Sequence, residues 1–424
     1  MNPKQRWRAG ALMLALVATT ALASTAVRFP GLSPGVAAGL CFGAVIAAAL
    51  LISWGAEAAQ FFVSQGLAVA VIALLQVVPE FMVEAVIAWQ AGKNGRVDLV
   101  FANATGSNRL LTGFGWPLVF LVTDLFHRRK GRGPLRAIEL RAEHVVEVVA
   151  LLVASLWYLV ILAKGSLGLE DSLVLGGGFF LYLWVLNRLP AEEEEELDEL
   201  IAPARALATT EPAGKRTAFI LGLFALGGVA MWAVADPFLD AMKEVAVAIG
   251  VSQFAFVQWV APFLTEFPEK VTAVYWARTV KLAPMALLNL ISSTVNQYTA
   301  LVAMVPIAFA LSAGRAAPIP MEGLHSVELF LSFATTLYGV ACLAKLRFTR
   351  GNANVMLALF LVQFFCPGRI DIPAGALGLP PTAMSVHLAV GFAYVACAAV
   401  ELLLHRNEIR LFRALRETVA RVRR

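Results

Sequence analysis

The stretch Leu75-Gln-Val-Val-Pro-Glu-Phe-Met-Val-Glu84 places a proline and two glutamates inside an apolar segment. A second stretch, Leu264-Thr-Glu-Phe-Pro-Glu269, repeats the Pro-Glu pair. In a membrane, a central charged side chain would cost roughly 2.5–3.5 kcal/mol. The proline would also break the helix and remove a backbone donor. Two such pairs in one chain predict an ion site built from two related halves.

Composition places the chain in a lipid bilayer. Of its 424 residues, 59% are hydrophobic and 15% are charged, and the mean hydropathy is +0.74. These values exclude an ordinary soluble domain and indicate an all-α membrane protein with several spans. Apolar runs of about 20 residues suit spanning helices, and the alternation of an outer-membrane barrel is absent. The net charge is +5, and the basic residues lie at the ends of the predicted helices and in the tail. The charge therefore does not indicate nucleic-acid binding.

The hydrophobic pattern predicts about 12 spanning helices. The segments are 11–28, 33–53, 57–92, 97–126, 143–163, 171–188, 216–235, 237–279, 284–312, 325–345, 352–368 and 383–404. Segments 57–92 and 237–279 are too long for one straight span, so we expect each to be broken at its Pro-Glu pair. The cysteines Cys41, Cys342, Cys366 and Cys397 are expected to be buried apolar residues without a disulfide or zinc site.

Basic residues orient these spans. They concentrate in the N-terminus, in loop 127–142, after residue 345 and in the C-terminal tail, which all fall on one side of the predicted map. The positive-inside rule makes that side cytoplasmic and predicts cytoplasmic termini in a bacterial-type inner membrane. The first segment also resembles a signal peptide, and we leave its cleavage open.

The two halves of the chain repeat. Segments 144–147 and 325–328 both read His-x-x-Glu, and asparagine-rich motifs follow both Pro-Glu pairs. On the predicted map the two halves have opposite orientations, which is typical of secondary transporters with a site at the midplane. We expect repeats at 33–188 and 216–368, flanks at 1–32 and 369–424, and a solvated acidic linker at 189–215. We expect the paired histidines and glutamates to have a structural or gating role and not a catalytic one.

The motifs themselves resemble the calcium/cation antiporter superfamily. The family pattern is Gly-Thr-Ser-x-Pro-Glu, followed by Gly-Asn-x-x-Gly-Ser-Asn, in two inverted copies. This chain has Ala102-Asn-Ala-Thr-Gly-Ser-Asn108 in the first copy and Leu288-Asn-Leu-Ile-Ser-Ser-Thr294 in the second. The resemblance implies a core of five plus five helices, with one extra helix at each end.

The resemblance also implies a set of cation ligands. By position, the central glutamates are Glu80 and Glu269, and the motif residues are Asn103, Asn289, Ser107, Ser293 and Thr265. Further candidates near the motifs are Glu84, Glu266, Asn108 and Gln297. The chain departs from the pattern at Gln76, Val77, Glu266, Ser292, Thr294, Leu111 and Gln297. These departures remove oxygen ligands expected of sodium sites and add carboxylates.

These residues predict an antiporter of Ca²⁺ or a related cation against Na⁺ or H⁺. Calcium takes about six to eight oxygen ligands, and competition for one set of carboxylates would couple the two fluxes. Glu84 and Glu266 could instead pair with Arg109 or Lys270. A Na⁺/H⁺ exchanger without calcium transport and a passive cation channel remain alternatives. No HExxH motif supports an enzyme. We expect no cofactor, and a monomer or weak oligomer in the bilayer.

Overall fold

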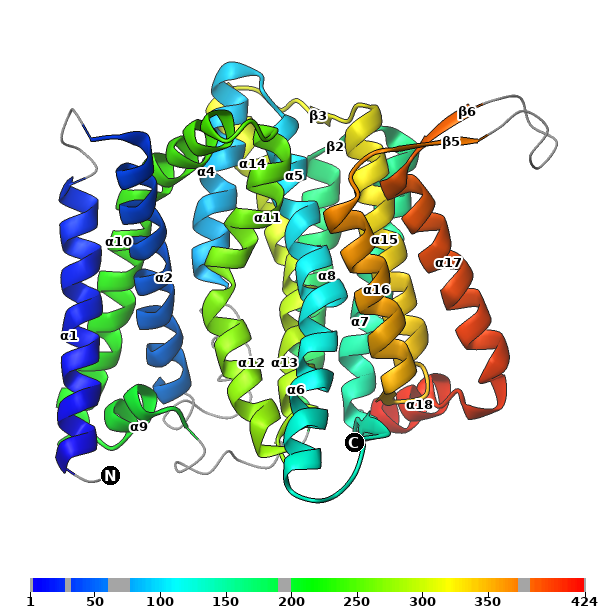
Figure 1. The fold of residues 1–424 in the computed structure, drawn as a ribbon, viewed down its shortest axis with the longest axis horizontal. Helices are drawn as coiled ribbons and strands as arrows, with labels where there is room; N and C mark the ends of the chain where they lie inside the picture. Colours follow the sequence, from blue (N-terminus) through cyan, green and yellow to red (C-terminus); the bar gives the residue numbers. More distant parts are fainter. Residues whose placement is uncertain (1–2, 27–31, 60–76, 190–199, 373–381, 423–424) are drawn as a thin grey trace.

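The computed structural model describes residues 3–26, 32–59, 77–189, 200–372 and 382–422. Its helices run roughly along one axis between two ends of the molecule (Figure 1). Both termini lie at the same end, together with the loop after Arg129 and the helix formed by the tail. We call this end the basic end, because the basic loop and the basic tail identified from the sequence lie there.

The first half of the chain is almost entirely helical. Its elements are α1 (Pro3–Ala26), α2 (Pro34–Ala59), α4 (Val78–Asn94), α5 (Asp98–Arg109), a π-helical turn (Leu110–Gly115), α6 (Trp116–Arg129), a 3-10 turn (Ala142–His144), α7 (Val145–Lys164) and α8 (Leu169–Leu186). The short helix α9 (Ala202–Ala208) follows at the basic end.

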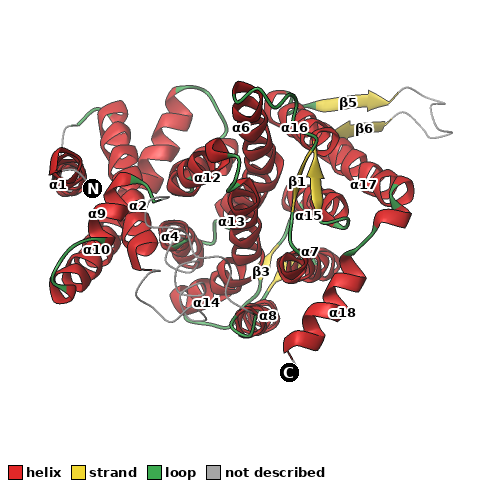
Figure 2. Cartoon of the chain, turned by 90° about the horizontal axis from the view of Figure 1, so that it is seen from below, coloured by secondary structure: helices red, strands yellow, loops and turns green. Residues whose placement is uncertain are grey.

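The second half is also almost entirely helical. It comprises α10 (Ala213–Ala248), α11 (Gln253–Thr265), α12 (Phe267–Thr279), α13 (Ala283–Asn296), a π-helical turn (Gln297–Leu301), α14 (Val302–Ala313), α15 (Gly323–Leu343), α16 (Arg350–Phe365), α17 (Val386–Leu404), a 3-10 turn (Arg406–Glu408) and α18 (Leu411–Val422). Viewed along the bundle (Figure 2), α4, α12 and α13 lie in the middle, and α1, α2 and α10 group on one side.

Short antiparallel strand pairs join the halves. At the basic end, β1 (Ala137–Glu139) pairs with β4 (Arg347–Thr349), and at the opposite end β2 (Ser166–Leu167) pairs with β3 (Ile319–Pro320). Strands β1 and β2 flank α7 in the first half, and β3 and β4 flank α15 in the second half. Inverting one half onto the other therefore places the pair β1–β4 where the pair β2–β3 lies. A third pair, β5 (Arg369–Ile372) with β6 (Thr382–Ser385), precedes α17.

The predicted helix breaks at the Pro-Glu pairs have a specific form. Pro79 lies at the start of α4, and Pro268 lies at the start of α12. Proline suits a first helical turn because its missing N–H has no partner there in any case. In the second half, the break falls at Glu266, which ends α11 and precedes α12. The preceding part of the first break lies outside the described residues.

Two predicted boundaries are wrong. Helix α10 continues through Pro237 to Ala248, whereas the sequence suggested a break at residues 235–237. Proline is tolerated within membrane helices when neighbouring groups satisfy the freed backbone. The chain turns instead at Gly250, where φ is 72°. Helix α2 extends to Ala59, so Glu57 belongs to its end and does not begin the next segment.

Eight helices among the described residues are long and apolar enough to cross a bilayer. Of the other predicted spans, the first corresponds to α1, whose apolar part is Gly10–Leu22. The remaining three correspond to α4, the broken pair α11 and α12, and α16, which are shorter or interrupted. The basic tail contains an amphipathic helix, α18, which buries Leu411 and Ala414. The four cysteines are free, and Cys366 is exposed, contrary to the expectation that all were buried.

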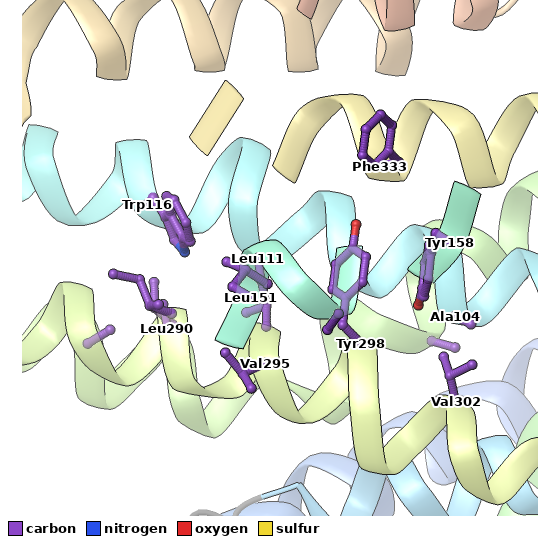
Figure 3. Close-up of a cluster of buried hydrophobic side chains, with 14 of the residues drawn as sticks. Ala104, Leu111, Trp116, Leu151, Tyr158, Leu290, Val295, Tyr298, Val302 and Phe333 are labelled. Carbon is purple, nitrogen blue, oxygen red and sulfur yellow. The ribbon is translucent and has the colours of Figure 1, made fainter. Parts of the chain in front are cut away.

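A tight apolar core surrounds the middle of the bundle (Figure 3). Trp116, Leu151, Tyr158 and Tyr298 are among its side chains, and they come from both halves. The rings of Tyr158 and Tyr298 lie 4.4 Å apart. The core therefore fixes α7 against the π-helical turn that begins at Gln297.

Helices α5 and α11 cross at Gly106, and we predict that Gly106→Ala prevents their normal packing. A Cβ at this position would lie 1.8 Å from the backbone oxygen of Gln258, which cannot move aside as a side chain could. Overpacking of this kind typically destabilises by about 1–3 kcal/mol. Thermal unfolding in detergent should show the loss, and Gly177→Ala should not, because nothing lies within 4 Å of its Cβ. Equal stabilities for the two variants would contradict this packing argument.

Candidate cation-binding site

The two Pro-Glu pairs meet in the middle of the bundle. From there α4 continues toward the end opposite the basic end, and α12 continues toward the basic end (Figure 1). Glu80 and Glu269 lie in the first turns of these helices. Helix N-termini favour anions, because the unpaired N–H groups and the helix dipole point toward them. The local sequence thus places both carboxylates at favourable helix ends at mid-depth.

Glu80 and Glu266 share hydrogen-bond partners at the centre of this site. The Ser107 hydroxyl on α5 contacts Oε1 of both glutamates. The Gln297 amide donates to Glu80 Oε2 at 3.0 Å, to Glu266 Oε1 at 2.9 Å and to Ser107 Oγ at 2.7 Å. These four residues are at most 2% exposed. We call them the central cluster; it joins side chains from both halves of the chain.

Glu269 lies beside the central cluster. It is close enough to interact electrostatically with Glu80 and Glu266, and Ser293 on α13 lies within hydrogen-bonding reach of its carboxyl group. Lys270 forms an ion pair with Glu266 Oε2, which was one of the pairings considered from the sequence. Glu266 therefore contacts both this lysine and the other members of the central cluster.

The fourth predicted carboxylate lies one turn further along α4. Glu84 is fully buried, and Oε2 accepts a hydrogen bond from the Asn103 amide of α5. The neighbouring Asn108 donates to the Tyr158 hydroxyl at 3.2 Å. Asn103, Ser107 and Asn108 thus lie along the same stretch of α5, and each contacts different side chains.

Two of the predicted ligands do not join these contacts. Asn289 is only half-buried, and its amide nitrogen has no hydrogen-bond partner among the described residues. The Thr265 hydroxyl donates to the backbone oxygen of Ala261 at 3.0 Å within its own helix. Gln76, one of the departures from the family pattern, lies outside the described residues.

The site is not symmetric, although the fold is. With the Pro-Glu pairs superposed in sequence, Ala273 corresponds to Glu84, and Val77 corresponds to Glu266. Asn103 therefore has a carboxylate partner, whereas Asn289 has none within the described part of the chain. The asymmetry explains why only one motif asparagine contacts a glutamate.

A π-helical turn follows the asparagine-rich motif in each half, at Leu110–Gly115 and Gln297–Leu301. Such turns are rare and occur frequently at functional sites. The second turn begins at Gln297 and is held by Tyr298, whose hydroxyl donates to the Ser332 backbone oxygen at 2.8 Å. No motif in the sequence indicated either turn.

Several buried oxygens near the cluster have no hydrogen-bond donor among the described residues. They are Glu84 Oε1, Asn103 Oδ1, Asn108 Oδ1, Glu269 Oε2 and Gln297 Oε1. Buried acceptors are normally satisfied, and each exception calls for an explanation. Carboxylate and amide oxygens are the ligands that hard cations prefer. In the described part of the chain, no group of three acidic, histidine or cysteine side chains lies close enough together to hold a metal ion in this arrangement.

A second buried polar network adjoins the motif on α5, and the sequence interpretation missed most of it. Arg109 and Glu328 form an ion pair of 2.5 Å between α5 and α15, and both side chains are at most 1% exposed. Gln258 on α11 donates to Glu328 at 2.8 Å, and His387 on α17 lies 2.5 Å from the other carboxylate oxygen. Arg109 is thus unavailable to Glu84. An arginine within a predicted span was the available signal.

The paired histidines have a structural use at helix starts. His144 Nδ1 accepts from the backbone N–H of Arg141, and His325 Nδ1 accepts from that of Glu322. These contacts satisfy backbone donors at the starts of α7 and α15. The two His-x-x-Glu segments thus mark corresponding helix starts in the two halves.

Comparison with known proteins agrees with this geometry. The family described as "Sodium/calcium exchanger protein" matches residues 32–187 and 219–366. The chain belongs to this family. It is therefore a member of a family of membrane transporters that exchange cations, as the motifs indicated. Among curated proteins, no sequence matches this chain.

Several solved structures share the fold of this family member. One described as the H⁺/Ca²⁺ exchanger CAX has a TM-score of 0.84 and 28% identity, covering 99% of each chain. The sodium-calcium exchanger NCX_Mj has a TM-score of 0.52 at 20% identity, covering 78% of this chain and 98% of its own. The structure of native YfkE has a TM-score of 0.55 at 15% identity, covering 84% and 98%.

Proposed function

We propose that this exchanger carries Ca²⁺, or a closely related divalent cation, against H⁺ by alternating access. The observation that carries the proposal is the set of buried oxygens without donors among the described residues, which belong to Glu84, Asn103, Asn108, Glu269 and Gln297. Such oxygens can replace the hydration shell of a hard cation. Movement of α4 and α12 relative to the rest of the bundle would bring them together around the ion.

The choice of H⁺ rests on the ligands that the chain lacks. Val77 and Leu111 stand where the family pattern has oxygen-bearing residues, so a sodium ion would find fewer ligands. The central carboxylates can carry protons when the divalent ion leaves, which needs no further ligand. A similar chain, the exchanger CAX, is described as an H⁺/Ca²⁺ exchanger.

We propose that the ion reaches the site from both ends of the bundle. A cavity of about 420 Å³ lies at the end opposite the basic end, and Ile87 and Ala91 of α4, which follow Glu84 along the helix, line it. Polar side chains of Gln90, Asp98 and Lys243 line the same cavity. With the basic end in the cytoplasm of a bacterial-type cell, this cavity would be the outer vestibule.

Uptake into proteoliposomes tests the exchange directly. Calcium uptake should require an opposing pH gradient and should collapse when a protonophore removes that gradient. A sodium gradient should drive little uptake. Sodium-driven uptake would favour Na⁺ as the counter-ion, uptake of Na⁺ against H⁺ without calcium would favour a Na⁺/H⁺ exchanger, and uptake without any counter-ion would indicate a channel.

We predict that Ca²⁺ stabilises the purified protein against thermal unfolding. A ligand that binds only the native state adds about 2.7 kcal/mol at one hundred times its dissociation constant. The unfolding temperature should therefore rise steadily with Ca²⁺ concentration in detergent. A flat curve up to millimolar Ca²⁺, with a rise for another cation, would reassign the substrate.

A further inference from the structure

Lys270 is a buried lysine at the edge of the proposed ion site. Its side chain is 7% exposed, and its ammonium pairs with Glu266 Oε2, four residues earlier. The next residue toward the N-terminus is Glu269. The ammonium group of Lys270 thus lies among the carboxylates that would bind the transported cation.

The fold does not demand a lysine at this position. Lys270 lies in the first turn of α12, where the helix dipole disfavours a positive charge. With the Pro-Glu pairs superposed, the corresponding residue of the first half is Phe81, which is apolar and half-buried. An apolar side chain therefore fits the equivalent place in the same fold. The reason for a lysine at this position must therefore lie in the carboxylates around it.

The two oxygens of Glu266 have different partners. Oε1 accepts from Gln297 at 2.9 Å and contacts Ser107 within the central cluster, while Oε2 holds Lys270. A cation entering the cluster must share Glu266 with the ammonium or displace it. Coulomb attraction scales with charge, so a divalent ion gains twice as much as a monovalent ion from the same carboxylates at the same distance.

We infer that Lys270 is a tethered cation that competes for Glu266 and thereby selects divalent over monovalent ions. The inference rests on the proposed function, because it concerns the preference of that site. With the ammonium present, a monovalent ion such as Na⁺ offers no more charge than the lysine already supplies. A divalent ion offers more and can share or take the carboxylate.

Removing the ammonium tests the inference. Lys270→Met should increase the affinity for Na⁺ about 10-fold, which corresponds to about 1.4 kcal/mol. The full-length protein in detergent would be titrated with NaCl and with CaCl₂ by calorimetry, and Na⁺ inhibition of Ca²⁺ uptake would be measured in proteoliposomes. Lys345→Met is the matched control, because Lys345 is a buried lysine paired with Glu401 outside the central cluster.

Two further variants separate charge from folding. Lys270→Gln is neutral but can still donate to Glu266, and it should show the same gain in Na⁺ affinity even if the methionine variant fails to fold. Lys270→Arg keeps the charge and should keep the preference for Ca²⁺. An unchanged preference in folded neutral variants would overturn the inference, as would folded neutral variants that bind no cation. A wild-type protein that binds neither ion would overturn the proposed function itself.

Discussion

Replacing either central glutamate with glutamine should stop transport. In Glu80→Gln and Glu269→Gln we expect Ca²⁺ uptake to fall at least about 100-fold, which corresponds to about 2.8 kcal/mol. The reason is that each change removes one full negative charge from a buried site while leaving side-chain size almost unchanged. Uptake of radioactive calcium into proteoliposomes measures the effect.

The same two variants should remain folded. Burying a charge is costly, so a neutral glutamine at mid-depth should leave the unfolding temperature unchanged or raise it. Glu244→Gln is the matched control, because Glu244 is exposed on α10. Uptake at the wild-type rate in either central variant would show that the ion passes elsewhere. Loss of uptake together with loss of folding would leave the carboxylates with only a structural role.

Breaking the buried ion pair beside the site should cause the largest loss of stability. Arg109→Met would leave the Glu328 carboxylate buried with Gln258 and His387 as its remaining partners. Removing one partner of a buried pair typically costs about 3–5 kcal/mol, because the remaining charge stays uncompensated. Thermal unfolding in detergent should show a large decrease in the midpoint temperature.

A double variant distinguishes this explanation from simple loss of packing. Arg109→Met combined with Glu328→Gln removes both charges, so we expect it to recover much of the lost stability. The double variant would still lack the cation–π contact in which Arg109 Cζ lies 4.9 Å from the centre of the Trp259 ring. Its recovery of stability should therefore be incomplete. A double variant as unstable as the single one would mean that the guanidinium acts through its size and not its charge.

Much of the site was predictable because its signals are local in sequence. A carboxylate beside a proline within an apolar run is costly wherever it lies, so Glu80 and Glu269 stand out without a structure. The repetition of the motif and the distribution of basic residues give the inverted architecture. Asn103 and Ser107 were implied by their positions in the motif that resembles the antiporter superfamily.

The contacts that the sequence did not indicate have equally specific causes. Asn289 was grouped with Asn103 by motif symmetry, but its half lacks a carboxylate equivalent to Glu84. Thr265 bonds its own helix backbone, an option open to any buried threonine. The predicted boundary between segments 216–235 and 237–279 adjoins Pro237, which lies inside α10 because a helix packed among others tolerates a proline. Gln258 and His387 carry no motif, and only packing brings them to Glu328.

The sequence by itself predicted that the protein spans a membrane, that its halves are inverted and that Glu80 and Glu269 come together at mid-depth. These properties follow from hydrophobicity, charge and helix-breaking residues, which act over a few neighbouring positions. The tertiary structure alone decided which oxygens share Ser107 and Gln297, and that Glu266 is divided between the central cluster and Lys270. Those contacts join α4, α5, the π-helical turn after α13 and the junction of α11 with α12. Distances between separate helices depend on packing across the whole bundle.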